Sequence, residues 1–241
     1  LSQLMASAWI KGTENYTANQ IAEMTESLGM ELGSFSGRNS FGISMEFLTE
    51  QLPIALDLFQ ELIARPNFPE EEIKKIKDTT KATIRQREDD IFKSTAYVMR
   101  KELFPAHPYR FEQEGTLESV DAIQRKDLVD FHKRFAVPGN IVMSVFGDMD
   151  SDKVLKNLEK KFGGIKGHSV TLKTFAEVPL AGPREQIYFL DKEQAMVMFG
   201  FHGPVLGNAD VYGLEVATSI LGSSFSGRIF NNIRDQLGSA Y

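Results

Sequence analysis

Histidine, a common metal ligand and general base, occurs at four isolated positions in this 241-residue chain: His107, His132, His168 and His202. No two of them have the i, i+4 spacing that places two imidazoles on one helix face to share a metal ion. Cysteine is absent, which excludes disulfides, thiolate metal sites and a cysteine nucleophile. We therefore interpret all four histidines as surface or loop residues.

Other stretches could also support chemistry. The acidic clusters Glu70–Glu72 and Glu88–Asp90 lack the glycine and spacing of a calcium loop, so we interpret each as a charged helix face. The stretch LGSSFSGRIF (221–230) lacks the Gly-Lys-Ser/Thr ending of a phosphate-binding loop, so we reject that interpretation. Met196 and Met198 lie in a predicted strand and are interpreted as core residues.

The composition is that of a globular protein, with 42% hydrophobic and 25% charged residues. A formal net charge of -6 provides no basic field for phosphate, which makes nucleic acid and anionic membrane surfaces poor partners, and we predict neither. No apolar run approaches the roughly 20 residues that cross a bilayer, so we predict a soluble chain without a membrane span. The compartment stays open between bacterial cytoplasm and periplasm.

The sequence predicts an alternation of helices and hairpins, which would position any functional residues. A helix is predicted at 19–28, and an antiparallel hairpin at 30–48 turns at GRNS. The remaining predicted elements of the first half are helices at 51–64, 69–103, 125–135 and 151–162 and a strand at 140–148. Clustered Gly and Pro after residue 162 indicate a linker. Beyond the linker, the pattern of two strands followed by helices begins again. The predicted strands are at 185–191 and 195–203, and the predicted helices are at 209–221 and 226–237.

These elements predict an α+β fold with an antiparallel sheet flanked by helices. The expected organisation is a complete α+β unit at 1–165, a linker at 166–183 and the start of a second, truncated unit at 184–241. Residue 1 is Leu and begins inside an apolar helix without a cap, so we interpret the chain as an internal fragment.

Several separated phrases carry a family resemblance. In order, they are IKGT (10–13), GMELGSFSGRNSFGISMEFL (29–48), the segment from HPYR to FGDMD (107–150) and ILGSSFSGRIFNNIRDQLGSAY (220–241). Together they resemble the pitrilysin or insulinase family of zinc peptidases, which includes mitochondrial processing peptidase and its bacterial relatives. The resemblance covers nearly the whole chain and implies the peptidase-like fold described above.

In that family an inverted motif, His-x-x-Glu-His, precedes the IKGT-like phrase and supplies two zinc ligands and a general base. Here Gln3 and Ser7 stand at the ligand positions and Ala6 at the base position. A further glutamate ligand is expected roughly seventy to eighty residues later. That window, TTKATIRQR (79–87), contains no carboxylate. The resemblance therefore implies a degenerate motif, without a catalytic metal in this chain.

The family's second unit carries an Arg-x6-Tyr pattern, which maps to Arg234 and Tyr241. A guanidinium can orient a substrate carbonyl, and a phenol can donate to the developing oxyanion. The resemblance implies a noncatalytic peptidase half that forms a chamber wall for unfolded peptides. It would supply both residues in trans to the zinc of a partner half, either a separate subunit or an upstream part of the same polypeptide. A helix-end salt bridge is the alternative for Arg234.

A purely structural subunit without any role in proteolysis is the alternative function, as in the inactive core proteins of a respiratory complex. The retained Arg234 and Tyr241 favour the peptidase partner, and the missing ligands disfavour an active protease. An intact His-x-x-Glu-His upstream or in a neighbouring reading frame would separate these possibilities. With its catalytic groups replaced, the first helix is expected to serve packing through Leu4, Met5, Trp9 and Ile10.

Overall fold

The computed structural model describes residues 1–176, 178–222 and 225–239, and the chain divides into two compact units, 1–198 and 199–241. The predicted linker at 166–183 falls inside the first unit. The proposed assignment of domains to 1–165 and 184–241 stays a prediction.

The predicted hairpin forms a two-stranded antiparallel sheet of β1 (Glu31–Ser36) and β2 (Phe41–Glu46). Its register pairs Leu32 with Met45, and the backbone N–H of Gly37 donates to the carbonyl of Ser40 at 2.7 Å to close the turn. Because side chains alternate across a strand, the apolar residues of β2 share one face and pack against the core. Among the described residues this is the whole sheet, which is smaller than the sequence predicts.

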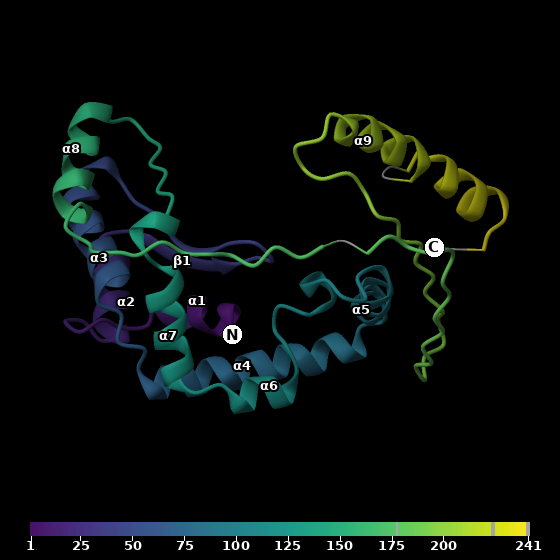
Figure 1. Ribbon diagram of the computed structural model, residues 1–241, viewed down its shortest axis with the longest axis horizontal. Helices are drawn as coiled ribbons and strands as arrows, with labels where there is room; N and C mark the ends of the chain where they lie inside the picture. The colour runs from purple at the N-terminus through teal and green to yellow at the C-terminus, as the bar shows by residue number, and fades with distance from the viewer. Residues whose placement is uncertain (177, 223–224, 240–241) are drawn as a thin grey trace. The chain divides into compact units, whose positions relative to one another are not determined.

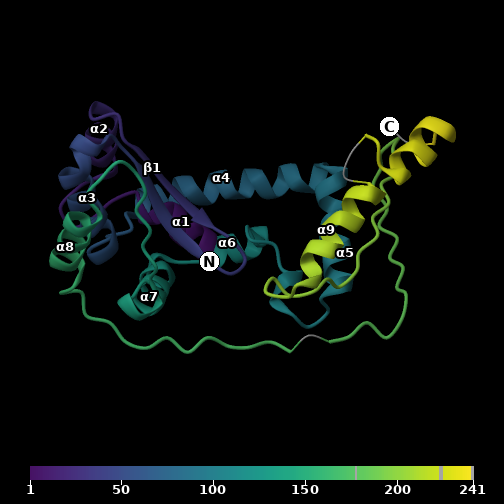
Figure 2. The same cartoon turned by 90° about the horizontal axis from the view of Figure 1, so that it is seen from above.

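Helix α1 (Ser2–Trp9) lies beside this hairpin in both views (Figures 1 and 2) and also contacts α4 (Glu70–Asp89) and α7 (Arg125–Phe135). Leu4, Met5 and Trp9 are buried as predicted, whereas Ile10 is only half-buried. The buried Trp9 needs a partner for its indole N–H, and it donates to the carbonyl of Leu62 at 2.6 Å.

A second layer of helices packs near the hairpin. Helix α2 (Ala18–Ser27) and helix α3 (Leu52–Ala64) share an apolar cluster with the sheet. Helix α8 (Ser151–Phe162) lies alongside α3 in both views (Figures 1 and 2). The side-chain amide of Gln60 joins them by donating to the carbonyl of Lys161 at 2.6 Å.

The helix predicted over 69–103 is two helices, α4 and α5 (Ile91–Leu103). Asp90 separates them with φ -88° and ψ 112°, and its carboxylate accepts hydrogen bonds from the backbone N–H groups of Phe92 and Lys93 at 2.9 and 3.1 Å. Helical periodicity continues through this point, but an aspartate that caps the next turn starts a new helix.

Short elements complete the first unit. Helix α6 (Leu117–Ala122), which the sequence did not predict, begins at a capping box formed by Thr116 and Ser119. Three 3-10 turns, η1 (Thr49–Gln51), η2 (Pro108–Arg110) and η3 (Pro138–Asn140), connect longer elements.

The strands predicted at 140–148, 185–191 and 195–203 do not form, and Figure 1 shows an extended trace after α8. In the first of these segments Ile141 and Met143 pack against the core, while Val142 and Phe146 are 93% and 90% exposed. This segment therefore alternates buried and exposed side chains as a strand does, but it is not paired with another strand. Alternation specifies which face is buried, but a strand also needs a hydrogen-bonded neighbour.

The second unit contains α9 (Asp210–Leu221) and the π-helix η4 (Phe230–Gln236). At the end of η4 the backbone N–H of the capping residue Leu237 donates to the carbonyl of Asn232 at 3.1 Å, which is the i to i-5 bond of a π-helix. The helix predicted at 226–237 is therefore mostly a π-helix and not an α-helix.

Candidate functional site: the α1 helix and the Arg234 segment

Helix α1 carries Gln3, Ala6 and Ser7, the three positions that the resemblance assigns to a degenerate zinc motif. Gln3 and Ser7 are one helical turn apart and half-buried, while Ala6 is 1% exposed. This is the i, i+4 arrangement that two histidine ligands would use. The donors present are an amide and a hydroxyl, which do not fit the anionic or imidazole ligands of a tetrahedral zinc site. Ala6 cannot accept a proton.

The window 79–87, where a further glutamate was expected, lies in α4 and faces the same interior. Thr80 and Ile84 are its buried residues, and Ile84 shares a core cluster with Met5 and Ala8 of α1. The contact between the α1 and α4 helices is therefore made by apolar side chains. Among the described residues no group of three or more His, Cys, Asp or Glu side chains could hold a metal ion.

His132 is a core residue, so its interpretation as a surface or loop residue is wrong. Its imidazole is 7% exposed and meets Trp9 and Phe68 with ring centroids 5.0 and 5.7 Å apart. Burial lowers its pKa to about 4, partly opposed by a hydrogen bond with the backbone of Ile63. Its spacing of four residues from the buried Leu128 on α7 was the sequence signal for burial.

The other histidines have different surroundings. His107 is half-buried in a loop, where its Nδ1 accepts a hydrogen bond from the backbone N–H of Tyr109 at 3.2 Å. His168 is exposed, and His202 is half-buried. Within the described part of the chain, none of these histidines belongs to a group of three or more potential metal ligands.

The loop that contains the HPYR phrase is fastened to the tip of the hairpin. Arg38 Nη1 donates to the carbonyls of Tyr109 and Phe111 at 3.0 and 2.9 Å. The hydroxyl of Tyr109 donates to Asn39 Oδ1 at 2.9 Å. This phrase of the family resemblance therefore has a structural role here, which is to join the sheet to the segment after α5.

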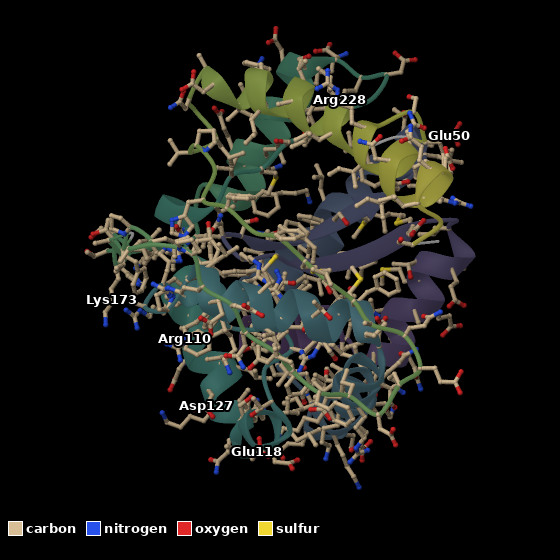
Figure 3. The ribbon with its side chains drawn as sticks, turned by 90° about the vertical axis from the view of Figure 1, so that its right-hand side faces the viewer. Glu50, Arg110, Glu118, Asp127, Lys173 and Arg228 are labelled. Carbon is tan, nitrogen blue, oxygen red and sulfur yellow. The ribbon has the colours of Figure 1, made fainter. Side chains whose placement is uncertain are left out.

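Two ion pairs hold the same loop to the helices. Arg100 of α5 pairs with Glu112, and Arg87 of α4 lies 3.4 Å from Glu114. By contrast, Glu118 and Asp127, each in the first turn of a helix, are exposed and point outward in Figure 3. Carboxylates at such helix ends oppose the positive end of the helix dipole.

The first acidic cluster is a charged helix face as predicted, whereas the second ends in a residue that caps a helix. Glu70–Glu72 form the first turn of α4, and Glu72 accepts a hydrogen bond from Lys75 at 2.6 Å. Asp90 caps α5 as described above. Met196 and Met198 are half-buried in an extended segment and belong to neither core cluster of the described residues.

Arg234 lies on η4 in the second unit, and its side chain is exposed. The guanidinium carbon stands 4.7 Å from the centroid of the Phe230 ring, and Phe230 meets Phe225 edge to face at 5.1 Å. No ion pair of Arg234 occurs among the described residues, so the predicted alternative of a helix-end salt bridge is not seen there. Tyr241 lies outside the described residues, and its pairing with Arg234 stays a prediction.

Comparison with known families decides the identity. Residues 1–114 match the model for insulinase (peptidase family M16), and residues 122–241 match the model for the peptidase M16 inactive domain. The chain belongs to the M16 peptidase family. The resemblance on 10–13, 29–48, 107–150 and 220–241 is thereby confirmed.

Relatives of this M16 chain carry contrasting descriptions. The "Uncharacterized zinc protease YmxG" of Bacillus subtilis is 27% identical over 241 residues, which cover 100% of this chain and 58% of the relative. The "Non-peptidase homolog YmxG" of Helicobacter pylori is 27% identical over 242 residues, covering 100% of this chain and 56% of the relative. The chain spans little more than half the length of these relatives.

Solved structures share the M16 fold. A peptidase M16 inactive domain from Pseudomonas fluorescens matches with a TM-score of 0.81 and 20% identity, covering 99% of this chain and 58% of that one. A protease from Helicobacter pylori matches with a TM-score of 0.73 and 21% identity, covering 97% and 57%. In addition, no helix in the described part of this chain is long and apolar enough to cross a bilayer.

Proposed function

We propose that this chain is a noncatalytic half of an M16 metallopeptidase, which forms part of a chamber wall and assists peptide cleavage at the zinc of a partner half. The observation that carries the proposal is the state of α1. This helix keeps its fold and its packing against the sheet and α4, while Gln3, Ala6 and Ser7 occupy the ligand and base positions. This combination supports a metallopeptidase framework that has lost its metal chemistry.

The interior between α1 and α4 supports the same conclusion. Met5 and Ala8 of α1 and Ile84 of α4 belong to one apolar cluster, and Met5 is 0% exposed. Introducing a charged metal site into such an interior requires desolvation that only a complete set of ligands offsets. The packing is therefore suited to a structural role for α1.

Peptide binding would use the backbone of the hairpin. Each of β1 and β2 pairs on one side only within the described residues. An unpaired strand edge can bind an extended peptide through main-chain hydrogen bonds, which require no particular side chains. This mode suits unfolded peptides as substrates.

Arg234 and Tyr241 would act on the substrate at the partner's zinc site. The exposed guanidinium would orient a peptide carbonyl, and the phenol would donate a hydrogen bond to the oxyanion. The partner half is either a separate subunit or another part of a longer polypeptide. The Helicobacter pylori relative, named a non-peptidase homolog, supports the proposal that a chain of this family can lack peptidase activity of its own.

The test is reconstitution of the full-length protein with a zinc-bearing M16 partner. Copurification, zinc content and cleavage of an unstructured peptide are measured for each protein alone and for the complex. We expect the zinc to reside in the partner and cleavage to require both proteins. A matched control replaces the glutamate of the partner's His-x-x-Glu-His motif by Gln, which should abolish cleavage without preventing assembly.

Three outcomes would contradict the proposal. Cleavage by this chain alone with stoichiometric zinc would make it a peptidase in its own right. Equal cleavage by the partner alone would leave this chain as a structural subunit. Failure of the full-length protein to associate with any zinc-bearing M16 protein, including other parts of its own polypeptide, would remove the basis for action in trans.

A further inference from the structure

We infer that Phe230 is a positioning residue for Arg234, whose guanidinium it holds over its aromatic ring in the orientation used on the substrate. The inference rests on the proposed function of Arg234 and adds a residue to it. The guanidinium carbon lies 4.7 Å from the ring centroid, within the range of a cation–π contact. Arginine also stacks its planar group on aromatic faces, so the contact restrains orientation as well as position.

The spacing of the two residues explains why their side chains meet. Phe230 and Arg234 are the first and fifth residues of η4, which is a π-helix. Side chains four positions apart lie on one face of a helix, in a π-helical turn as in an α-helical one. Isolated π-helical turns occur frequently at functional sites, because they redirect a side chain from the regular helical path.

The ring is itself restrained by its neighbours. Phe230 is half-buried, and Phe225 meets it edge to face with centroids 5.1 Å apart and an interplanar angle of 85°. The electrostatic preference for edge-to-face aromatic pairs favours this direction of the Phe230 face. A long side chain such as arginine then loses less rotamer freedom when it binds substrate, because the ring has already restrained it.

Gly227 anchors the start of this segment. A Cβ added there would lie 2.9 Å from the Cα of Gly222 and 3.0 Å from the carbonyl oxygen of Leu221. At Gly227 the backbone therefore approaches the end of α9 too closely for any residue that has a Cβ atom. This contact sets the position from which η4 presents Phe230 and Arg234.

The charge of Arg234 is left available for a substrate. It forms no ion pair with the described residues, and an aromatic face attracts a guanidinium without neutralising it. A carboxylate partner would compete with a peptide carbonyl for the same N–H donors. An aromatic partner leaves the donors at the guanidinium edge free to hydrogen-bond.

The test is a double-mutant cycle in the full-length protein assembled with its zinc-bearing partner. Rates of peptide cleavage are measured for Phe230→Leu, Arg234→Ala and the double variant, and kcat and KM are determined separately. We expect Phe230→Leu to lower kcat/KM about tenfold, within the range of cation–π energies. The loss should disappear in the Arg234→Ala background. Phe230→Tyr, which keeps the aromatic face, should retain activity.

Controls separate positioning from folding. Arg228→Ala changes a nearby exposed arginine, labelled in Figure 3, that stands over no ring among the described residues, and should not alter cleavage. Thermal unfolding, assembly and partner zinc content should be the same for all variants. If the Phe230→Leu variant unfolds at a lower temperature than the wild type, Phe230→Met replaces it, because the Met side chain is similar in length to Phe and has no ring face.

The outcomes distinguish this inference from the proposed function. An equal loss on Phe230→Leu with and without Arg234 would assign Phe230 a merely structural role and overturn the inference. Wild-type cleavage by Phe230→Leu together with impaired Arg234→Ala would overturn the inference and leave the proposed function standing. Wild-type cleavage by Arg234→Ala would overturn the inference together with the role proposed for Arg234.

Discussion

Trp9 and His132 meet edge to face in the interior of the first unit, with ring centroids 5.0 Å apart and an interplanar angle of 78°. Their contact joins α1, which carries the predicted positions of the degenerate zinc motif, to α7. The indole N–H of Trp9 also donates to the carbonyl of Leu62, which joins α1 to α3. The α1 helix is thus held by aromatic packing and one buried hydrogen bond.

Trp9→Ala should lower the free energy of unfolding by about 3 to 5 kcal/mol, because it leaves a large cavity in a packed core. Trp9→Phe should lower it by about 1 to 3 kcal/mol, because the Leu62 carbonyl loses its donor. Denaturant titration measures both. Leu48→Ala, at a side chain 67% exposed, is the control and should change stability by less than about 0.5 kcal/mol. A Trp9→Ala loss below about 1 kcal/mol would contradict the packing role.

Protonation of His132 should destabilise the protein in acid. Its folded pKa of about 4 lies below the ordinary value of 6.5, so between these values the unfolded chain binds a proton that the folded chain does not. The contribution is fully present above pH 6.5 and is lost as pH falls toward 4, by on the order of 3 kcal/mol. Urea titrations between pH 4 and 7 measure this slope. His132→Leu should flatten it, whereas the exposed control His168→Gln should retain it.

The pair Arg100–Glu112 should contribute more to stability than a surface pair. Its side chains are only 25% and 10% exposed, and it fastens the loop after α5 to that helix. Glu112→Ala should lower the free energy of unfolding by about 1 to 3 kcal/mol, because it leaves a partly buried guanidinium unpaired. The control is Asp130→Ala, which breaks the exposed pair with Lys126 and should cost at most about 0.5 kcal/mol. Equal losses in chemical denaturation would refute this difference.

The purified chain should hold no stoichiometric zinc and cleave no peptide alone. Gln3 and Ser7 supply no anionic or imidazole donor, and α4 offers no carboxylate within 79–87. Elemental analysis after dialysis, with a zinc-bearing M16 protein as the positive control, measures the metal content. One tightly held zinc ion per chain would show that the motif was placed on the wrong residues.

Arg234→Ala and Tyr241→Phe should each lower turnover in the reconstituted complex by a factor on the order of 10² to 10³, the cost of removing one oxyanion-stabilising donor. Assembly and partner zinc content should not change. The double variant should lose less than the product of the two factors, since both groups would serve one transition state. Wild-type rates in both single variants would favour the structural-subunit alternative.

Local sequence patterns predicted much of the helical structure. Helices α7 and α8 have the predicted bounds, and α2 and α3 differ from them by a residue at one or both ends. Periodicity and end signals are local, so they can be read from neighbouring residues. The break at Asp90 was missed because a capping side chain competes with a helical pattern that continues on both sides.

The sequence by itself also determined what α1 cannot do, because ligand chemistry is a property of residue type: Gln3, Ala6 and Ser7 lack the donors and the base wherever the helix lies. Only the tertiary structure decided that His132 is buried beside Trp9, and that the apolar alternation at 140–148 covers one core face without forming a paired strand. It also decided that Arg234 stands over Phe230 and that their segment is a π-helix, which local periodicity does not reveal. Burial and pairing depend on partners distant along the chain, and the energies of those contacts override local preference.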